Sequence, residues 1–269
     1  MNTKRNLGVL SLPAGLNTAG RQFVGPIEFV SASPADAVNH VIAMAMLGGG
    51  FHVHLANAYT VALADKSADY RAVLAAPAVN YPDGKPIGWV SALRGQSPRL
   101  KQVRGPQLFL DVFQDGVSKN IRHYLLGSTP EVLAKLTDNL KSRCPGVIIV
   151  GAESPPFRSL SGLELDEQDE RIRTSGAQVV WVGLGTPKQD IEAQRLAHSV
   201  PVTAVAIGAA FDFAAGTVRE APRWMSRVGL EWFYRLLREP RRLWKRYIFG
   251  NARFLSATFR SADAGAKRP

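Results

Sequence analysis

The segment Gln178-Val-Val-Trp-Val-Gly-Leu-Gly-Thr-Pro-Lys-Gln189 decides the fold class of this 269-residue chain. Its opening residues, Gln178–Val182, form an apolar run of strand length, and two glycines suited to a tight turn follow. Pro187 is favoured at the first position of a helix, and a helical pattern continues to Ala197. A further apolar run, Val202–Ile207, comes next. Strand, helix and strand in this order predict a β-α-β unit with parallel strands.

The same alternation extends toward the N-terminus. Further strands are expected at Phe51–Ala56, Ala78–Tyr81, Arg122–Leu126 and Val147–Val150. Helical patterns lie between them, at Asn57–Ala76, Ile87–Leu93, Pro106–Phe113, from Pro130 onward and at Glu164–Thr174. Ser128 or Thr129 is expected to cap the helix that begins at Pro130. The pattern predicts an α/β fold with a mainly parallel sheet flanked by helices.

Composition excludes several classes of protein. With 46% hydrophobic residues the chain can bury a large core, so extensive disorder is not expected. The single cysteine, Cys144, rules out an internal disulfide framework and fits a reducing cytoplasm. No window holds the roughly 18 uninterrupted apolar residues of a membrane span. Pro13, Gly15 and Asn17 interrupt the apolar start of the chain, which therefore does not match a signal peptide.

The C-terminal fifth of the chain differs from the rest. Residues Arg219–Pro269 hold thirteen Lys or Arg and four acidic residues, a net charge of +9 out of +11. Aromatic residues recur among these arginines, and Pro240 is expected to split the segment into two amphipathic helices. We therefore expect an α/β domain at 1–218 and a basic helical appendage at 219–269. Such a charge fits a membrane surface, a nucleic acid or a phosphorylated acceptor, and Trp and Tyr beside Arg favour the membrane interface.

The turn between the predicted strand and helix at Gly183–Gln189 is a candidate anion site. Gly185 allows a ligand to approach the backbone, and free amides at a helix start favour a diphosphate. Thr186 is expected to cap that helix, and Gln189 lies in its first turn. An ordinary well-capped turn would show the same residues. The spacing matches neither a Walker A loop nor the dinucleotide fingerprint.

Three further polar residues are candidates: Asp83 and Asn57 at the ends of predicted strands, and Asp212 between two phenylalanines. Asp83 could serve as a general base or could simply be a turn residue before Gly84. Asn57 could bind a ligand or cap the next helix, and Asp212 could bind a ligand or hold a loop. The five histidines lack the spacing of a zinc site, so structural roles are expected for them, and no Asp-x-Asp pair suggests a metal-dependent donor site. We expect no bound metal or cofactor.

Three ordered motifs carry a family resemblance that runs from about Phe51 to Leu255. They are Val182-Gly-Leu-Gly-Thr-Pro-Lys-Gln189, Gly208-Ala-Ala-Phe-Asp-Phe-Ala-Ala-Gly216 and Gly229-Leu-Glu-Trp-Phe-Tyr-Arg-Leu-Leu-Arg-Glu-Pro-Arg-Arg-Leu-Trp-Lys-Arg-Tyr247. With these motifs the chain resembles the WecG/TagA/CpsF glycosyltransferases, which are typified by a wall teichoic acid N-acetylmannosaminyltransferase, and within them the exopolysaccharide branch. The architecture that we expect is accordingly Rossmann-like.

The resemblance implies an inverting, metal-independent transfer from a UDP-sugar to a sugar linked to a polyprenyl diphosphate. It matches Asp83 to the catalytic base, Asn57 to a polar position in the first sheet loop and Gln189 to a pocket glutamine. Arg235, Arg242 and Lys245 fall on tail positions that grip substrate phosphates. The family tail also docks on the membrane, so we expect a peripheral protein on the cytoplasmic face.

Some positions depart from the family pattern. Leu55-Ala56-Asn57 stands where Thr-Pro-Asn is common, Asp83-Gly84-Lys85-Pro86 replaces Asp-Gly-x-Gly, and Gln107 replaces an acidic residue. These departures leave the donor sugar open. They also keep an alternative function open, that of a non-catalytic protein that binds a nucleotide sugar or a lipid. Nucleic-acid binding is not expected, because no recognised binding module is present.

Overall fold

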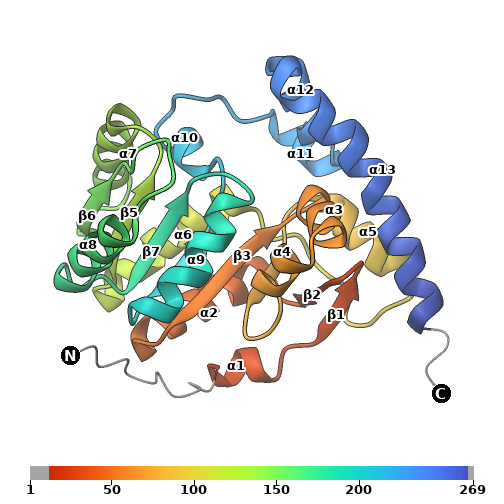
Figure 1. Cartoon of the computed structure of the whole chain (residues 1–269), viewed down its shortest axis with the longest axis horizontal. Helices are drawn as coiled ribbons and strands as arrows, with labels where there is room; N and C mark the ends of the chain where they lie inside the picture. Colours follow the sequence, from red (N-terminus) through yellow and green to blue (C-terminus); the bar gives the residue numbers. More distant parts are fainter. Residues whose placement is uncertain (1–11, 266–269) are drawn as a thin grey trace.

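A computed structural model describes residues 12–265 of the chain, without the side chains of residues 223, 226, 227, 242, 245–249 and 261–265. Its centre is a six-stranded sheet in which every neighbouring pair is parallel, in the order β4-β3-β8-β7-β5-β6. The strands are β3 (Phe51–Ala56), β4 (Val79–Pro82), β5 (Arg122–Gly127), β6 (Ile148–Glu153), β7 (Val179–Gly183) and β8 (Thr203–Ala206). The predicted α/β fold with a mainly parallel sheet is confirmed (Figure 1).

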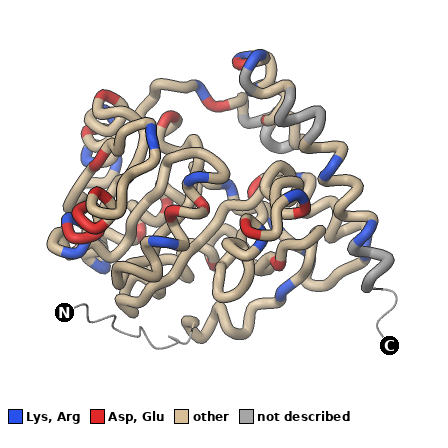
Figure 2. The backbone as a smooth tube through the Cα atoms, viewed as in Figure 1, with Lys and Arg blue, Asp and Glu red and all other residues tan. Residues whose placement is uncertain are grey.

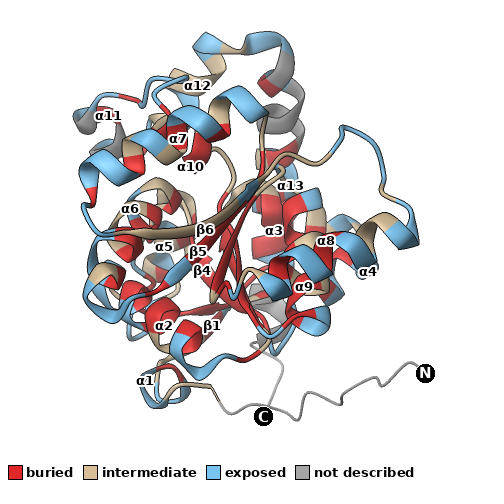
Figure 3. Cartoon of the chain, turned by 90° about the vertical axis from the view of Figure 1, so that its left-hand side faces the viewer, coloured by how far each residue is buried: buried red, intermediate tan, exposed pale blue. Residues whose placement is uncertain are grey.

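Helices cover both faces of the sheet, because successive strand residues point to opposite sides. One face packs against α2 (Pro34–Leu47), α6 (Gly105–Gly116), α7 (Pro130–Arg143) and α10 (Ala210–Ala214). The other packs against α8 (Gly162–Thr174) and α9 (Lys188–Ser199). In β7, Trp181 points to the first face and Val180 and Val182 to the second. The buried strands between the two helical layers are visible in Figure 3.

A second, smaller layer forms beside β4 and was not predicted. It contains the antiparallel hairpin of β1 (Arg21–Val24) and β2 (Ile27–Val30), with α3 (Ala58–Lys66), α4 (Ala68–Val73) and α5 (Lys85–Leu93). The hairpin strands have only four residues each, too few to give a clear alternating pattern. Short elements α1 (Ala14–Asn17) and the 3-10 helix η1 (Val117–Lys119) complete the body.

Two predicted helix boundaries can be checked against capping bonds. Thr129 caps α7 by accepting a hydrogen bond from the amide of Val132, as expected. The single helix predicted from Asn57 to Ala76 is wrong, because it divides into α3 and α4 at Ser67. The Ser67 backbone is extended there, and its hydroxyl accepts from the Tyr70 amide, so the serine ends one helix and caps the next.

The basic C-terminal segment forms α11 (Arg223–Val228), α12 (Glu231–Arg238) and α13 (Pro240–Gly265), and Figure 2 marks basic positions on α12 and α13 in blue. The helix break expected at Pro240 is confirmed, and α11 is an additional helix. α13 runs along α3, where Phe254 and Ala257 join the core of the second layer. None of the helices in the described range is both long and apolar enough to cross a bilayer.

Candidate active site

The carboxyl ends of four neighbouring strands bring most of the predicted site residues to one edge of the sheet. Asp83 follows β4 and Asn57 follows β3, and the last residues of these strands are paired in register. The amide of Asp83 donates to the carbonyl of Ala56 at 2.9 Å, so the two loops are in direct contact. Gly208 follows β8 and Gly185 follows β7 along the same edge. Ligands of open α/β sheets bind at this edge.

Asp83 lies among charged groups from two helices. The backbone amide of Gly105, the first residue of α6, donates to its carboxylate. Burial and then the charge of Glu231 raise the pKa of Asp83, while Arg104, the Gly105 amide and Arg235 lower it, and the balance is a pKa of about 7. A carboxylate with this pKa can exchange a proton near neutral pH, which is the property of a general base.

Arg104 and Glu231 are two site residues that the sequence did not reveal. The Arg104 guanidinium donates to the Glu231 carboxylate at 2.9 Å and to that of Glu220 at 3.1 Å. Although burial opposes it, the two acidic partners raise the pKa of Arg104 above its ordinary value. In the sequence, a lone arginine before Gly105 and a glutamate more than a hundred residues later show no relation, and only the fold brings them together.

Asn57 is a helix cap. Its side-chain oxygen accepts from the amides of Tyr59 at 3.0 Å and Thr60 at 3.3 Å, and the Thr60 hydroxyl in turn accepts from the Asn57 amide. This capping box fixes the turn between β3 and α3. Of the two roles considered for Asn57, the structure therefore shows the capping one.

The turn between β7 and α9 is organised by Gln189. This side chain is buried, and its oxygen accepts from the amide of Gly185 at 3.0 Å, where the backbone is left-handed (φ 78°). The predicted capping role of Thr186 is wrong. α9 begins at Lys188 with Pro187 in the cap position, so the Thr186 hydroxyl lies one residue too early and instead accepts from the Gln189 nitrogen at 3.5 Å.

The start of α9 offers fewer free amides than the sequence suggested. Gln189 donates its amide to the carbonyl of Gly185, and Asp190 and Ile191 donate theirs to the carbonyl of Pro187. The exposed surface of this turn is therefore mainly the backbone around Gly185, which lies in the open. The Gly185 amide is itself bonded to Gln189, so this position offers a ligand close approach without a side chain rather than a free donor.

The β8–α10 loop lies beside the same glutamine. A Cβ at Gly208 would lie 3.7 Å from the Gln189 nitrogen, and the left-handed backbone there (φ 65°) suits glycine. Asp212, in α10, is half-buried, and its carbonyl accepts from the amides of Thr217 and Val218. Its backbone thus holds the chain that leads toward the C-terminal helices.

One of the three predicted tail residues reaches this region in the described part of the chain. The Arg235 guanidinium of α12 lies 5.8 Å from the centre of the Phe213 ring, and its charge lowers the pKa of Asp83. Arg242 and Lys245 belong to α13, but their side chains fall outside what the structure describes.

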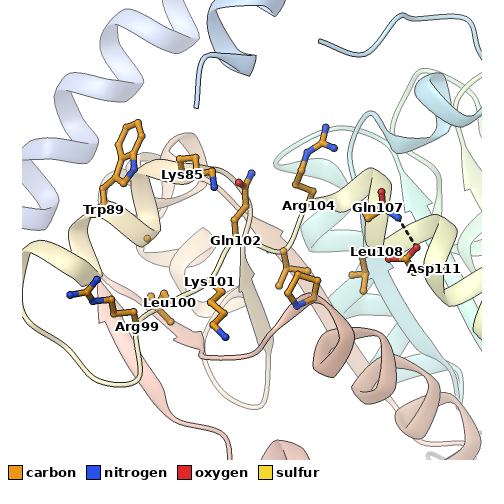
Figure 4. A pocket seen from close by; sticks show the side chains of 13 residues that line it. Lys85, Trp89, Arg99, Leu100, Lys101, Gln102, Arg104, Gln107, Leu108 and Asp111 are labelled. Atoms are coloured by element: carbon orange, nitrogen blue, oxygen red, sulfur yellow. Dashed lines mark hydrogen bonds between the residues drawn. The ribbon is translucent and has the colours of Figure 1, made fainter. Parts of the chain in front are cut away.

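A cleft of about 660 Å³ opens between α5 and α6, beside the Asp83 loop. Four basic residues line it, Lys85, Arg99, Lys101 and Arg104, together with the indole of Trp89. Figure 4 shows that Lys85 and Arg104 lie toward the C-terminal helices, whereas Arg99 and Lys101 extend the other way. The cleft therefore offers several cations to an anionic ligand.

Gln107, which replaces an acidic residue of the family pattern, lies at the α6 side of this cleft. Its nitrogen donates to the carboxylate of Asp111 at 2.6 Å, an interaction drawn in Figure 4. A carboxylate is thus present one helical turn further along α6. Leu55, the other departure near the base, is buried in the main core.

A buried polar network connects α9 to β3 and α4. The Asp190 carboxylate bonds to the His54 ring at 3.0 Å and accepts from the Tyr70 hydroxyl at 2.8 Å, and the His52 ring bonds to His54 at 2.9 Å. Burial lowers the pKa of His52 to about 3, so this ring is neutral. These contacts fit the structural role expected for both histidines. Within residues 12–265, no group of three or more His, Cys, Asp or Glu side chains is placed to hold a metal ion.

Two comparisons with known proteins identify the family of this chain. The sequence pattern of the Glycosyl transferase WecG/TagA/CpsF family matches residues 23–268, which include both the sheet and the C-terminal helices. A similar protein is the N-acetylglucosaminyldiphosphoundecaprenol N-acetyl-beta-D-mannosaminyltransferase of Bacillus spizizenii, 31% identical over 201 residues that cover 74% of each chain. With its candidate base at the carboxyl edge of a parallel sheet, the chain belongs to the WecG/TagA/CpsF family of glycosyltransferases.

Proposed function

We propose that this glycosyltransferase transfers a hexose or N-acetylhexosamine from a UDP-sugar to a saccharide carried on a polyprenyl diphosphate, with inversion, in the synthesis of a cell-surface polysaccharide. The Asp83 carboxylate, whose pKa is about 7 and on which the cleft-lining Arg104 acts, is the observation that carries the proposal. Support also comes from the similar protein of Bacillus spizizenii, whose name includes a sugar linked to a polyprenyl diphosphate.

In the proposed reaction, a hydroxyl of the acceptor attacks the anomeric carbon of the donor sugar. Asp83 takes the hydroxyl proton as the new C–O bond forms, and the bond between the anomeric carbon and the UDP oxygen breaks on the opposite side. A single displacement of this kind inverts the configuration. Negative charge develops on the departing diphosphate, and preorganised cations at that position lower the barrier.

The proposed donor contacts come from the sheet edge and the tail. Gly185, which is exposed and has no side chain, would let the diphosphate approach this turn closely, and Thr186 and Gln189 form the wall behind it. Asn57 and Asp212, from the two neighbouring loops, are proposed to contact the sugar. Arg235, Arg242 and Lys245 are proposed to bind phosphate oxygens. Of these three, Arg235 has support from its electrostatic influence on Asp83.

The C-terminal helices are proposed to place the enzyme on the inner face of the cell membrane, where a lipid-linked acceptor is anchored. Large apolar side chains lie exposed on all three helices, namely Trp224, Val228, Trp232, Phe233, Leu237 and Trp244. Exposed aromatic and leucine side chains can enter the interface between headgroups and acyl chains, and nearby arginines attract anionic lipid. The same segment would then carry both the lipid contact and part of the active site.

The test is incubation of the full-length protein with a panel of UDP-sugars and a short-chain polyprenyl-diphosphate saccharide, with release of UDP measured. We expect release with one or a few donors, and only when the acceptor is present. Binding of a UDP-sugar by calorimetry without any release of UDP would instead support the non-catalytic binding protein.

A further inference from the structure

The first turn of α12 is the part of the C-terminal helices that closes over the candidate base. Just before it, Gly229 has a left-handed backbone (φ 80°) and packs on α5. A Cβ at this glycine would lie 3.0 Å from the Trp89 ring and 3.2 Å from the Cβ of Lys85. A side chain has no room there, and this close approach brings the start of α12, with Glu231 two residues later, to Arg104 at the cleft.

Glu231 forms an ion pair that holds α12 in this position. Its carboxylate accepts from Arg104 at 2.9 Å, and the side chains of both residues are about three-quarters buried. Arg104 occupies the N-cap position of α6, and the next residue, Gly105, donates its amide to Asp83. The ion pair therefore joins the C-terminal helices to the backbone that holds the base.

We propose that Glu231 is a positioning residue for the transfer, which keeps α12 seated over Asp83 through Arg104 and offsets the charge that this arginine presents to the base. The inference rests on the proposed role of Asp83 as base. In this role Glu231 does not bind the substrate. It links the position of the C-terminal helices to the proton affinity of Asp83.

The charged groups around Asp83 make this coupling measurable. α12 contributes Glu231 and Arg235, α6 contributes Arg104 and the Gly105 amide, and Lys85 begins α5 two residues after the aspartate. Without Glu231, Asp83 loses a repelling carboxylate, and Arg104 is left less neutralised. Both changes favour the ionised form of Asp83, so its pKa falls. Loss of Arg104 should instead raise the pKa of Asp83.

Glu220 provides a matched control. It bonds to the same guanidinium as Glu231, at 3.1 Å, but its side chain is more exposed and it is not among the main causes of the Asp83 pKa. A variant that loses only a salt bridge to Arg104 is therefore Glu220→Gln, and one that also loses the contact with the base is Glu231→Gln.

The experiment uses the full-length protein as wild type, Glu231→Gln, Glu220→Gln, Arg104→Gln and the double variant Arg104→Gln/Glu231→Gln. The first readout is the NMR titration of the Asp83 carboxyl carbon, assigned by its absence in Asp83→Asn, and needs no substrate. We expect the midpoint to fall by about one pH unit in Glu231→Gln, to rise in Arg104→Gln and to move much less in Glu220→Gln. The double variant retains the charge balance and should lie between the single ones.

The second readout is the pH profile of UDP release. The acidic limb should shift with the NMR midpoint, and turnover of Glu231→Gln should fall about tenfold because α12 is less well seated. Midpoints that are equal in folded wild type, Glu231→Gln and Arg104→Gln would overturn the inference. If the midpoints move as expected but no donor gives UDP release in the wild type, the coupling stands and the proposed transfer fails.

Discussion

The C-terminal helices meet the body of the protein near two aspartates, by direct ion pairs at Asp65 and through the charges of Glu231 and Arg235 at Asp83. At one end of α13, Asp65 of α3 accepts hydrogen bonds from Arg253 at 2.7 Å and Arg260 at 2.8 Å. Burial opposes this, but the two arginines lower the pKa of Asp65. At the other end, beneath α12, burial and a neighbouring carboxylate raise the pKa of Asp83 to about 7.

We call the contact of α13 with Asp65 the anchor, and the part of the C-terminal helices around Glu231, near Asp83, the lid. Around Asp65, Phe254 and Ala257 are buried in a hydrophobic cluster, so this part of α13 belongs to the core. Around Asp83, α12 is held by the Arg104 ion pairs and by the packing of Gly229, while its large apolar side chains remain exposed. A carboxylate that is fully paired contributes to stability. A carboxylate whose pKa lies near 7 can instead accept a proton during a reaction.

The largest effect is expected at the lid, from Asp83→Asn. An amide cannot accept the acceptor proton, so turnover should fall by about 10² or more, measured as UDP release from the full-length protein. Wild-type turnover should also decline as the pH drops through about 7, because protonation removes the base. Near-normal turnover in Asp83→Asn would assign the base to another residue.

The same variant has a stability control with a defined sign. Because the pKa of Asp83 is raised in the fold, its contribution to stability is present below the unfolded pKa, near 4, and is lost as the pH rises through about 7. Asp83→Asn should therefore be more stable than wild type at pH 8, by up to about 4 kcal/mol, and nearly equal at pH 3. Denaturant unfolding at the two pH values measures this.

A second large effect is expected from the apolar surface of α12. Trp232→Ser, Phe233→Ser and Leu237→Ser combined should weaken binding to anionic vesicles by about 100-fold, since burial of about 40 Å² of apolar surface on each side chain contributes about 1 kcal/mol, or about 3 kcal/mol in total. Vesicle sedimentation at physiological salt gives the measurement. Phe157→Ser, which alters an even more exposed apolar residue before α8, is the control and should bind like wild type.

An intermediate effect is expected from Gly229→Ala. The added methyl group meets Trp89 and also requires a left-handed backbone, so α12 should be displaced and turnover should fall about tenfold. Gly216→Ala is the matched control, because its backbone is also left-handed (φ 72°) but a Cβ there lies in open space. Equal losses of turnover in the two variants would mean that backbone strain alone, and no lid contact, is responsible.

A smaller effect is expected at the anchor. Asp65→Asn removes ion pairs whose arginines are largely exposed, so it should cost about 1 kcal/mol of stability at pH 7 in denaturant unfolding. That contribution is present above the unfolded pKa and is lost as the pH falls through the lowered pKa of Asp65. Turnover should change less than in Gly229→Ala, and a larger loss would contradict the separation of anchor from lid.

No effect is expected from removal of divalent cations. Since protein cations are proposed to offset the charge on the leaving diphosphate, UDP release should be unchanged in excess EDTA. If EDTA abolished UDP release and Mg²⁺ or Mn²⁺ restored it, a metal ion rather than these protein cations would offset the charge on the diphosphate.

Local patterns were sufficient to predict much of this protein. Buried parallel strands read as short apolar runs, so the strands and the α/β class followed from the sequence. Asp83 was proposed because it follows such a strand, and Gln189 because it lies in a family motif. The break at Pro240 followed from the proline ring itself. Predictions based on a single capping residue were less secure, as the different outcomes at Thr129 and Thr186 show.

Only the tertiary structure decided how the charged residues are paired. Arg104, Glu220 and Glu231 have no common sequence signal, because their contact depends on how the chain returns over the sheet after β8. The same return sets the pKa of Asp83, since burial and distant charges act through space. The sequence determined which residues end each strand, and the packing of the C-terminal helices determined which charges surround them.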